Sequence, residues 1–170
     1  MALAFSTPSE ERITATLARY PNKQAALLPV LWIAQEEWGY VSEEAMELVA
    51  RKLDLSPAFV YGVVTFYTMY AQEPRGRFHL QVCGNLSCCL RGAERITHHL
   101  EKRLMIKVGE TTDDKTFSLT EVECLASCGT APMMQVDERV KGGFRSDYHE
   151  NLTEAEVDRL LEELRARARG

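Results

Sequence analysis

The sequence has no apolar run approaching the roughly 20 residues that a membrane-spanning helix needs, so we do not expect direct membrane insertion. It has no basic stripe either. Acidic residues outnumber basic ones by 25 to 20 with both signs interspersed, so nucleic acid is not an expected partner. No Gly-x-Gly-x-x-Gly motif follows an expected strand, no Walker-type loop occurs, and no Cys-x-x-Cys pair is present. These gaps argue against a nucleotide-binding loop and against a thiol–disulfide catalyst.

We also find no pattern of a targeting signal. The first residues, MALAFSTPSEER, turn polar too early for a secretory signal, and a transit peptide would be rich in arginine and poor in acids. We therefore expect a cytoplasmic or matrix-side protein, or a mature form. The chain has five cysteines, an odd number, and shows no export signal. Both features favour a metal or redox site over a disulfide framework.

Residues 1–72 predict a small helical bundle as an N-terminal domain. Thr7-Pro8-Ser9-Glu10 has the pattern of a capping box and opens a helix to about Tyr20. Asn22 can cap a second helix that ends at Gly39, and Pro29 predicts a kink in that helix or a split into two shorter pieces.

Two further helices are expected to open at Ser42 and at Ser56-Pro57. Five aromatic residues in this half form either a binding face or part of the bundle core, and their helical spacing favours the core. They are Phe66, Tyr67, Tyr70, Trp32 and Trp38.

Residues 73–170 alternate strands with helices, which predicts a compact domain of mixed α and β structure. The expected strands cover residues 78–82, 117–122 and 133–136, and the expected helices cover 93–104 and, capped by Thr153, 154–167. The segment Val140–Asp147, with Gly142-Gly143, is interpreted as a flexible loop. The arginines of the RARAR tail are expected to complement the dipole of the last helix rather than bind nucleic acid.

Four cysteines follow two of the expected strands. Cys83 and Cys88 begin where strand 78–82 ends, and Cys124 and Cys128 follow strand 117–122. If the two strands are neighbours, both loops meet at one edge of the sheet and bring four thiolates together.

Four thiolates suit either zinc or an iron–sulfur cluster. Structural zinc typically uses Cys-x2-Cys pairs, whereas here four residues separate the first pair and three the second. The wider loops favour a cluster in which each pair holds one of two irons, and plant-type ferredoxins also contain a Cys-x4-Cys element. The four histidines are scattered, and we interpret them as structural or surface residues.

The composition of the loops agrees with a cluster. Small residues let backbone N–H groups approach the sulfurs, and such hydrogen bonds raise the reduction potential. The N-terminus of the helix beginning near Ala93 adds positive potential on the same side. Cys89 could replace Cys88 as a ligand by a one-residue slip, or be a plain thiol, which we favour. The small residues are Gly84, Ser87, Ala126, Ser127 and Gly129.

Several segments together resemble the thioredoxin-like [2Fe–2S] subunit of the NADH dehydrogenase module of respiratory complex I (NADH:quinone oxidoreductase). They are YGVVTFY at Tyr61–Tyr67, VCGNLSC at Val82–Cys88, ECLASCGTAP at Glu123–Pro132 and YHENLT at Tyr148–Thr153. The similarity extends over nearly the whole chain. Two features depart from the family: Cys89 is not required there, and Val140–Asp147 resembles an insertion.

The resemblance implies a thioredoxin-like ferredoxin domain over residues 73–170 and assigns the ligands of one [2Fe–2S] cluster to Cys83, Cys88, Cys124 and Cys128. It implies that the cluster exchanges single electrons with FMN in a partner flavoprotein subunit, which also binds NADH. A second peripheral-arm iron–sulfur subunit is a further expected partner. The complex would lie on the cytoplasmic side of a bacterial inner membrane, or on the matrix side in an organelle.

Other functions stay open on sequence alone. Homologous subunits serve NAD-linked formate dehydrogenases and bifurcating hydrogenases. A zinc-stabilised interaction module is the alternative from a different class. A free-standing thioredoxin-like ferredoxin would need only about 100 residues, and the added helical domain argues against it.

Overall fold

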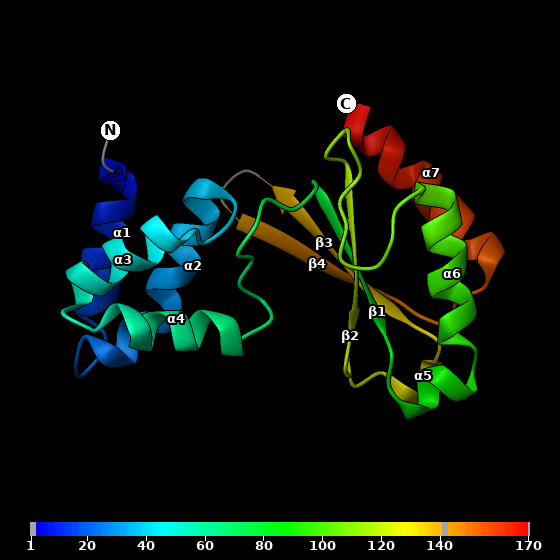
Figure 1. The fold of residues 1–170 in the computed structure, drawn as a ribbon, viewed down its shortest axis with the longest axis horizontal. Coiled ribbons are helices and arrows are strands. Elements are labelled where there is room, and N and C mark those ends of the chain that lie inside the picture. The colour runs from blue at the N-terminus through cyan, green and yellow to red at the C-terminus, as the bar shows by residue number, and fades with distance from the viewer. Residues whose placement is uncertain (1–2, 141–142, 170) are drawn as a thin grey trace. The chain divides into compact units, whose positions relative to one another are not determined.

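The computed structural model describes residues 3–140 and 143–169. The chain divides into two compact units, Met1–Pro74 and Arg75–Gly170. The described part of the first unit contains helices without a sheet, and the second contains a four-stranded sheet with helices (Figure 1). The predicted fold class, a helical front followed by a mixed α and β domain, is confirmed. Within the described residues no helix has both the length and the apolar character that crossing a bilayer requires.

The helices of the first unit begin close to the expected residues. Ser42 and Ser56 each cap a helix by accepting a hydrogen bond from a backbone N–H three residues later. The predicted split near Pro29 is confirmed, because a short 3₁₀ turn precedes a helix that carries Pro29 in its first turn, where a missing N–H costs little. The elements are α1 (Thr7–Leu17), η1 (Gln24–Ala26), α2 (Leu27–Trp38), α3 (Glu43–Leu53) and α4 (Pro57–Phe66).

The predicted capping box at Thr7 is wrong. Thr7 is already the first helical residue, and Ser6 occupies the capping position with extended backbone angles. The carboxylate of Glu10, expected to close the box, instead forms an ion pair with Lys52 of α3. A tertiary contact has therefore taken the side chain that the local pattern assigned to capping.

The aromatic cluster is divided between core and surface. Trp32 and Trp38 pack against the core of the first unit, and Tyr70 is 2% exposed and donates a hydrogen bond to the carbonyl of Leu28. Phe66 and Tyr67 are exposed, so the core prediction is wrong for these two. The reason is local: α4 ends at Phe66, and its buried face consists of Val60 and Val64.

The second unit is built on a sheet with the strand order β2-β1-β3-β4. β1 and β2 are parallel, whereas β3 is antiparallel to both β1 and β4. Figure 1 shows α5, α6 and α7 on the same side of this sheet, where the apolar side chains of the strands are buried against them. The elements are β1 (Phe78–Cys83), α5 (Leu86–Leu90), α6 (Ala93–Leu104), β2 (Phe117–Val122), η2 (Cys128–Thr130), β3 (Met134–Val140), β4 (Gly143–His149) and α7 (Glu154–Arg169).

The interpretation of Val140–Asp147 as a flexible loop is wrong. β3 extends to Val140, and residues 143–149 form β4, so that Val140 pairs with Gly143 and Asp137 with Ser146. Apolar and polar residues alternate weakly in this segment, and the pairing with β3 decides its conformation. The part of the predicted loop at Gly142 lies outside the described residues.

The last helix agrees with its prediction. Thr153 and Glu156 form a reciprocal capping box, since each side chain accepts a hydrogen bond from the other residue's backbone N–H. The short helix α5 was not predicted. Its five residues are too few to produce a helical periodicity in the sequence.

Candidate metal centre

The two cysteine segments leave the same edge of the sheet. Cys83 is the last residue of β1 and pairs with Val122, the last residue of the parallel neighbour β2. The first segment then enters α5, which is capped by Asn85 and carries Cys88. The second segment places Cys124 just beyond β2 and Cys128 at the start of η2. The expected meeting of two loops at neighbouring strand ends therefore occurs in the fold.

The four thiols come together in space. The thiols of Cys88 and Cys124 lie close enough to the Cys83 thiol for both to lower its pKa. Cys128 lies near enough to Cys88 to act on it electrostatically. Cys83 and Cys88 are buried, whereas Cys124 and Cys128 are exposed. The constellation thus has an inner pair from β1 and α5 and an outer pair from the loop after β2.

Backbone N–H groups point at these sulfurs. The N–H groups of Asn85 and Leu125 donate to the Cys83 sulfur, and the N–H of Met133 donates to the Cys88 sulfur. The N–H of Ala126 donates to the Cys124 sulfur at 3.4 Å. Ala126 reaches this position with a positive φ of 59°, which is uncommon for a residue with a side chain.

The environment acts differently on the two inner thiols. Burial raises the pKa of Cys83, but the hydrogen bonds from Asn85, Leu125 and the neighbouring thiols together lower that pKa below its ordinary value. Burial and the neighbouring Cys83 raise the pKa of Cys88, against a smaller lowering by the N–H of Met133. Cys83 is therefore the inner thiol whose thiolate the protein stabilises most directly.

The donors differ from those expected. Among the small residues, Ala126 directs its N–H at a sulfur as predicted. The N–H of Gly84 instead donates to the carbonyl of Val122, continuing the ladder between β1 and β2. A Cβ at Gly84 would lie 2.5 Å from the carboxylate of Glu121, an exposed side chain that would have to move to admit it. The donors Asn85, Leu125 and Met133 could not be predicted from the sequence, because any residue type except proline supplies a backbone N–H.

Cys88 and Cys89 point in different directions. Cys88 is 2% exposed and belongs to the same core cluster as Cys83. The exposed Cys89 donates its thiol proton to the carbonyl of Gly84 at 3.0 Å. Successive residues on a helix are separated by about 100°, so only one of two neighbouring cysteines can face the site. This geometry favours Cys88 over Cys89.

The four-thiol constellation suits a two-iron cluster. Such a cluster needs two cysteine sulfurs on each iron, and an inner and an outer pair supply that arrangement. N–H donors around the sulfurs stabilise the negative charge of iron-bound thiolates.

The chain is similar to several known proteins. Residues 13–165 match the family model of the thioredoxin-like [2Fe-2S] ferredoxin. The chain is 47% identical over 159 residues to an NADH-quinone oxidoreductase subunit of Rhizobium meliloti (strain 1021), covering 94% of this chain and 90% of the relative. It is 40% identical to NADH-quinone oxidoreductase subunit 2 of Thermus thermophilus, covering 96% and 88%. For an NADH-quinone oxidoreductase subunit of Rickettsia prowazekii the identity is 38%, covering 94% and 88%.

A solved structure shares the fold at low sequence identity. The air-oxidized NAD+-reducing [NiFe]-hydrogenase aligns with a TM-score of 0.67 and 20% identity. The alignment covers 83% of this chain and 23% of the hydrogenase chain, so this chain spans about a quarter of that protein's length. At this identity the likeness concerns the fold alone.

Proposed function

Because the chain belongs to the thioredoxin-like [2Fe-2S] ferredoxin family, we propose that Cys83, Cys88, Cys124 and Cys128 are the ligands of its one [2Fe–2S] cluster. The protein is an electron-transfer subunit of NADH-quinone oxidoreductase, an oxidoreductase complex of several subunits. The observation that carries the ligand assignment is the meeting of two cysteine pairs at one sheet edge, surrounded by N–H donors.

A bound [2Fe–2S] cluster accepts and releases one electron at a time. The residues of this chain position the cluster and set its surroundings. The inner pair, Cys83 and Cys88, fixes the cluster to the hydrophobic core and keeps water from that side. The N–H groups directed at the sulfurs offset the added negative charge of the reduced state. The outer pair, Cys124 and Cys128, lies at the surface, where an electron partner can approach.

The identity of the partners is part of the proposal. We propose that the exposed side of the site faces FMN in a flavoprotein subunit that also binds NADH, and that this chain binds neither. A second iron–sulfur subunit of the peripheral arm is proposed as a further neighbour, on the cytoplasmic or matrix side of the membrane. We further propose that residues 1–72 and 73–170 are its two domains, the second holding the cluster.

A hydrogenase or formate dehydrogenase subunit is the competing assignment. The hydrogenase likeness supports a shared fold, whereas the relatives at 38–47% identity over nearly their whole length are named NADH-quinone oxidoreductase subunits. Purifying the complex from its source and identifying the accompanying subunits separates the two. Subunits of a membrane-bound quinone reductase support the assignment, and a hydrogenase large subunit overturns it.

The cluster itself is tested by electron paramagnetic resonance of the full chain after anaerobic reconstitution and reduction with dithionite, together with iron and zinc analysis. We expect two irons per chain and a rhombic signal with an average g below the free-electron value. A colourless protein with stoichiometric zinc and no signal would instead make the chain a structural zinc module.

A further inference from the structure

The segment Tyr148–Leu152, which begins with the last two residues of β4, lies against the loop that carries the outer cysteines. The register of the sheet explains the contact. His149 pairs with Met134, and Met134 pairs with Val82, the residue before Cys83. The end of β4 therefore reaches the same sheet edge as the cysteine segments.

Backbone hydrogen bonds join this segment to the far side of the loop. The N–H of Asn151 donates to the carbonyl of Thr130 at 2.7 Å, and the N–H of Leu152 donates to the carbonyl of Pro132 at 2.9 Å. Asn151 has a positive φ of 51°, which asparagine tolerates better than most residues. Leu152 is 5% exposed and belongs to the core, so the segment is a fixed support for the loop.

Glu150 holds the residues that flank Cys128. Its carboxylate accepts a hydrogen bond from the hydroxyl of Ser127 and another, at 2.5 Å, from the hydroxyl of Thr130. The two hydroxyls also lie 2.8 Å apart. One carboxylate from outside the loop thus closes the turn in which Cys128 sits, between Ser127 and Thr130.

Tyr148 reaches Cys124 through a single peptide group. Its hydroxyl donates to the carbonyl oxygen of Leu125 at 3.0 Å. That carbonyl belongs to the same peptide group as the N–H of Ala126, which donates to the Cys124 sulfur. Hydrogen bonds in such a chain polarise one another, so the hydroxyl strengthens the N–H as a donor and fixes the plane of the peptide.

We propose that Tyr148 and Glu150 are positioning residues for the outer ligand pair. Tyr148 strengthens the N–H···S bond at Cys124, and Glu150 holds the turn that carries Cys128. The proposal rests on the cluster assignment above. It adds which side chains hold the exposed side of the cysteine site in place. Because the outer pair has no core burial, these two side chains replace the support that the core gives to Cys83 and Cys88.

The substitution Tyr148→Phe tests the first half. It removes the hydroxyl and keeps the ring. Hydrogen bonds to cluster sulfurs raise the reduction potential, so we expect the potential of the full-length holoprotein to become more negative, with an unchanged melting temperature. Tyr61→Phe is the matched control, since Tyr61 is as exposed as Tyr148, at 51%, and lies on α4. Equal reduction potentials for Tyr148→Phe and wild type would overturn the proposed role of Tyr148.

The substitution Glu150→Ala tests the second half. We expect the holoprotein to release iron to a chelator about tenfold faster, in the range seen when outer-shell partners of metal ligands are lost. Glu150→Gln keeps one acceptor oxygen and should restore part of the retention. Glu162→Ala, at an exposed position of α7, is the control and should release iron at the wild-type rate.

The outcomes separate this inference from the cluster assignment. If the wild type fails to hold two irons per chain, the proposed function is overturned, and the positioning roles are overturned with it. If the wild type holds them and Glu150→Ala releases iron at the same rate, the cluster assignment stands and the positioning role of Glu150 is overturned. A change in the rhombic paramagnetic signal of Tyr148→Phe, with a wild-type signal for Tyr61→Phe, independently supports the proposed role of Tyr148.

Discussion

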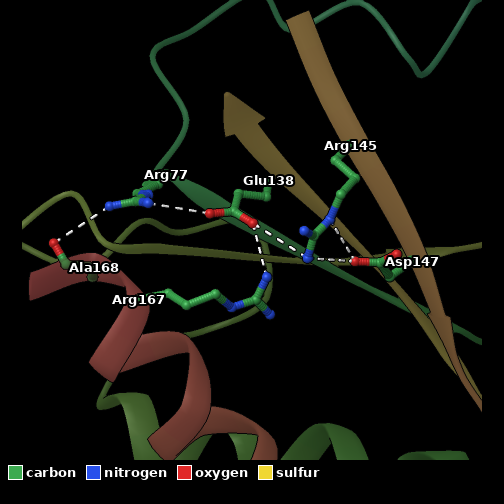
Figure 2. A network of polar contacts seen from close by, with 6 residues as sticks. All are labelled: Arg77, Glu138, Arg145, Asp147, Arg167 and Ala168. Carbon is green, nitrogen blue, oxygen red and sulfur yellow. Dashed lines mark hydrogen bonds and ion pairs between the residues drawn. The ribbon is translucent and has the colours of Figure 1, made fainter. Parts of the chain in front are cut away.

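The guanidinium of Arg167, near the end of α7, donates a hydrogen bond at 2.9 Å to the carboxylate of Glu138 in β3. Glu138 is buried and also pairs with Arg77 at 3.2 Å and with Arg145 at 3.5 Å (Figure 2). One carboxylate therefore ties the last helix to the start of β1 and to β4. This network lies at the end of β1 opposite Cys83, away from the cysteine constellation.

Removing this carboxylate should destabilise the protein without altering the cluster. Glu138→Ala leaves three arginines without their shared partner. Loss of one member of a buried pair costs roughly 3–5 kcal/mol, but these arginines are more than a third exposed, so we expect about 1–3 kcal/mol. The melting temperature should fall by several degrees, with an unchanged paramagnetic signal. A melting temperature equal to that of wild type would mean that the network adds no stability.

A surface pair provides the control for that measurement. Arg159 lies 3.8 Å from Glu156, one turn away on α7, and is exposed. Exposed pairs of this kind contribute little, so Arg159→Ala should change the unfolding free energy by less than about 0.5 kcal/mol.

Local patterns predicted most elements that depend on nearby residues. The strand over residues 117–122 and the helix over 93–104 have the expected bounds, because alternation and amphipathic spacing are strong there. The tail arginines illustrate the limit. Their spacing indicated only a helix dipole effect, whereas Arg167 bonds with Glu138 and lies over the ring of Phe78. Contacts between residues this far apart in sequence have no local pattern.

The cysteine site was predictable for a similar reason, and only in part. Spacing and the strand ends indicated four thiols at one sheet edge. The N–H donors of Asn85, Leu125 and Met133 come from the backbone and have no signature of residue type. Tyr148 and Glu150 were visible only within a motif of the resemblance, and their contact with the loop follows from the register of β4, a strand that the sequence did not predict.

Substituting the cysteines one at a time tests the ligand register. Cys83→Ser and Cys124→Ser each remove a thiolate from one of the two pairs, so we expect the cluster to be lost or greatly reduced in iron content. Cys89→Ser removes a thiol that bonds to the carbonyl of Gly84, so its spectrum should match that of wild type. Iron analysis and paramagnetic resonance give the readout. Loss of the signal in Cys89→Ser would shift the second ligand by one residue.

His79 should make stability depend on pH. Burial, and secondarily the charge of Arg75, lower the pKa of His79 to about 3 from an ordinary value near 6.5. Its ring contacts the hydroxyl of Thr120 at 2.8 Å and the guanidinium of Arg75 at 3.2 Å. Between these pKa values the unfolded chain binds a proton that the folded chain does not, so stability falls as pH falls below about 6.5.

The measurement is urea unfolding of the full chain at pH 7.5 and at pH 5.5. A difference of one bound proton between the folded and unfolded states changes the free energy of unfolding by about 1.4 kcal/mol per pH unit. The unfolding free energy of wild type should therefore fall by roughly 1 kcal/mol more than that of His79→Gln between the two conditions. The variant lacks the imidazole of His79, so its own loss of stability measures the contribution of the acidic side chains. Equal losses in both proteins would show that His79 is protonated in the folded state near its ordinary pKa.

The outer face of α5 should contribute to docking with the partner subunit. Leu86 and Leu90, one turn apart beside Cys88, are 70% and 79% exposed. Two leucines exposed to this degree next to the cysteine site are typical of a surface that another protein covers. Leu90→Glu should therefore weaken association with the proposed flavoprotein subunit at least tenfold, because burial of the charge is costly, and should leave the isolated cluster spectrum unchanged. Met105→Glu, at the far end of α6 and 90% exposed, is the control for an exposed apolar residue away from the cysteines. Equal weakening by both substitutions would indicate a general effect of added negative charge, and wild-type affinity in Leu90→Glu would place the contact elsewhere.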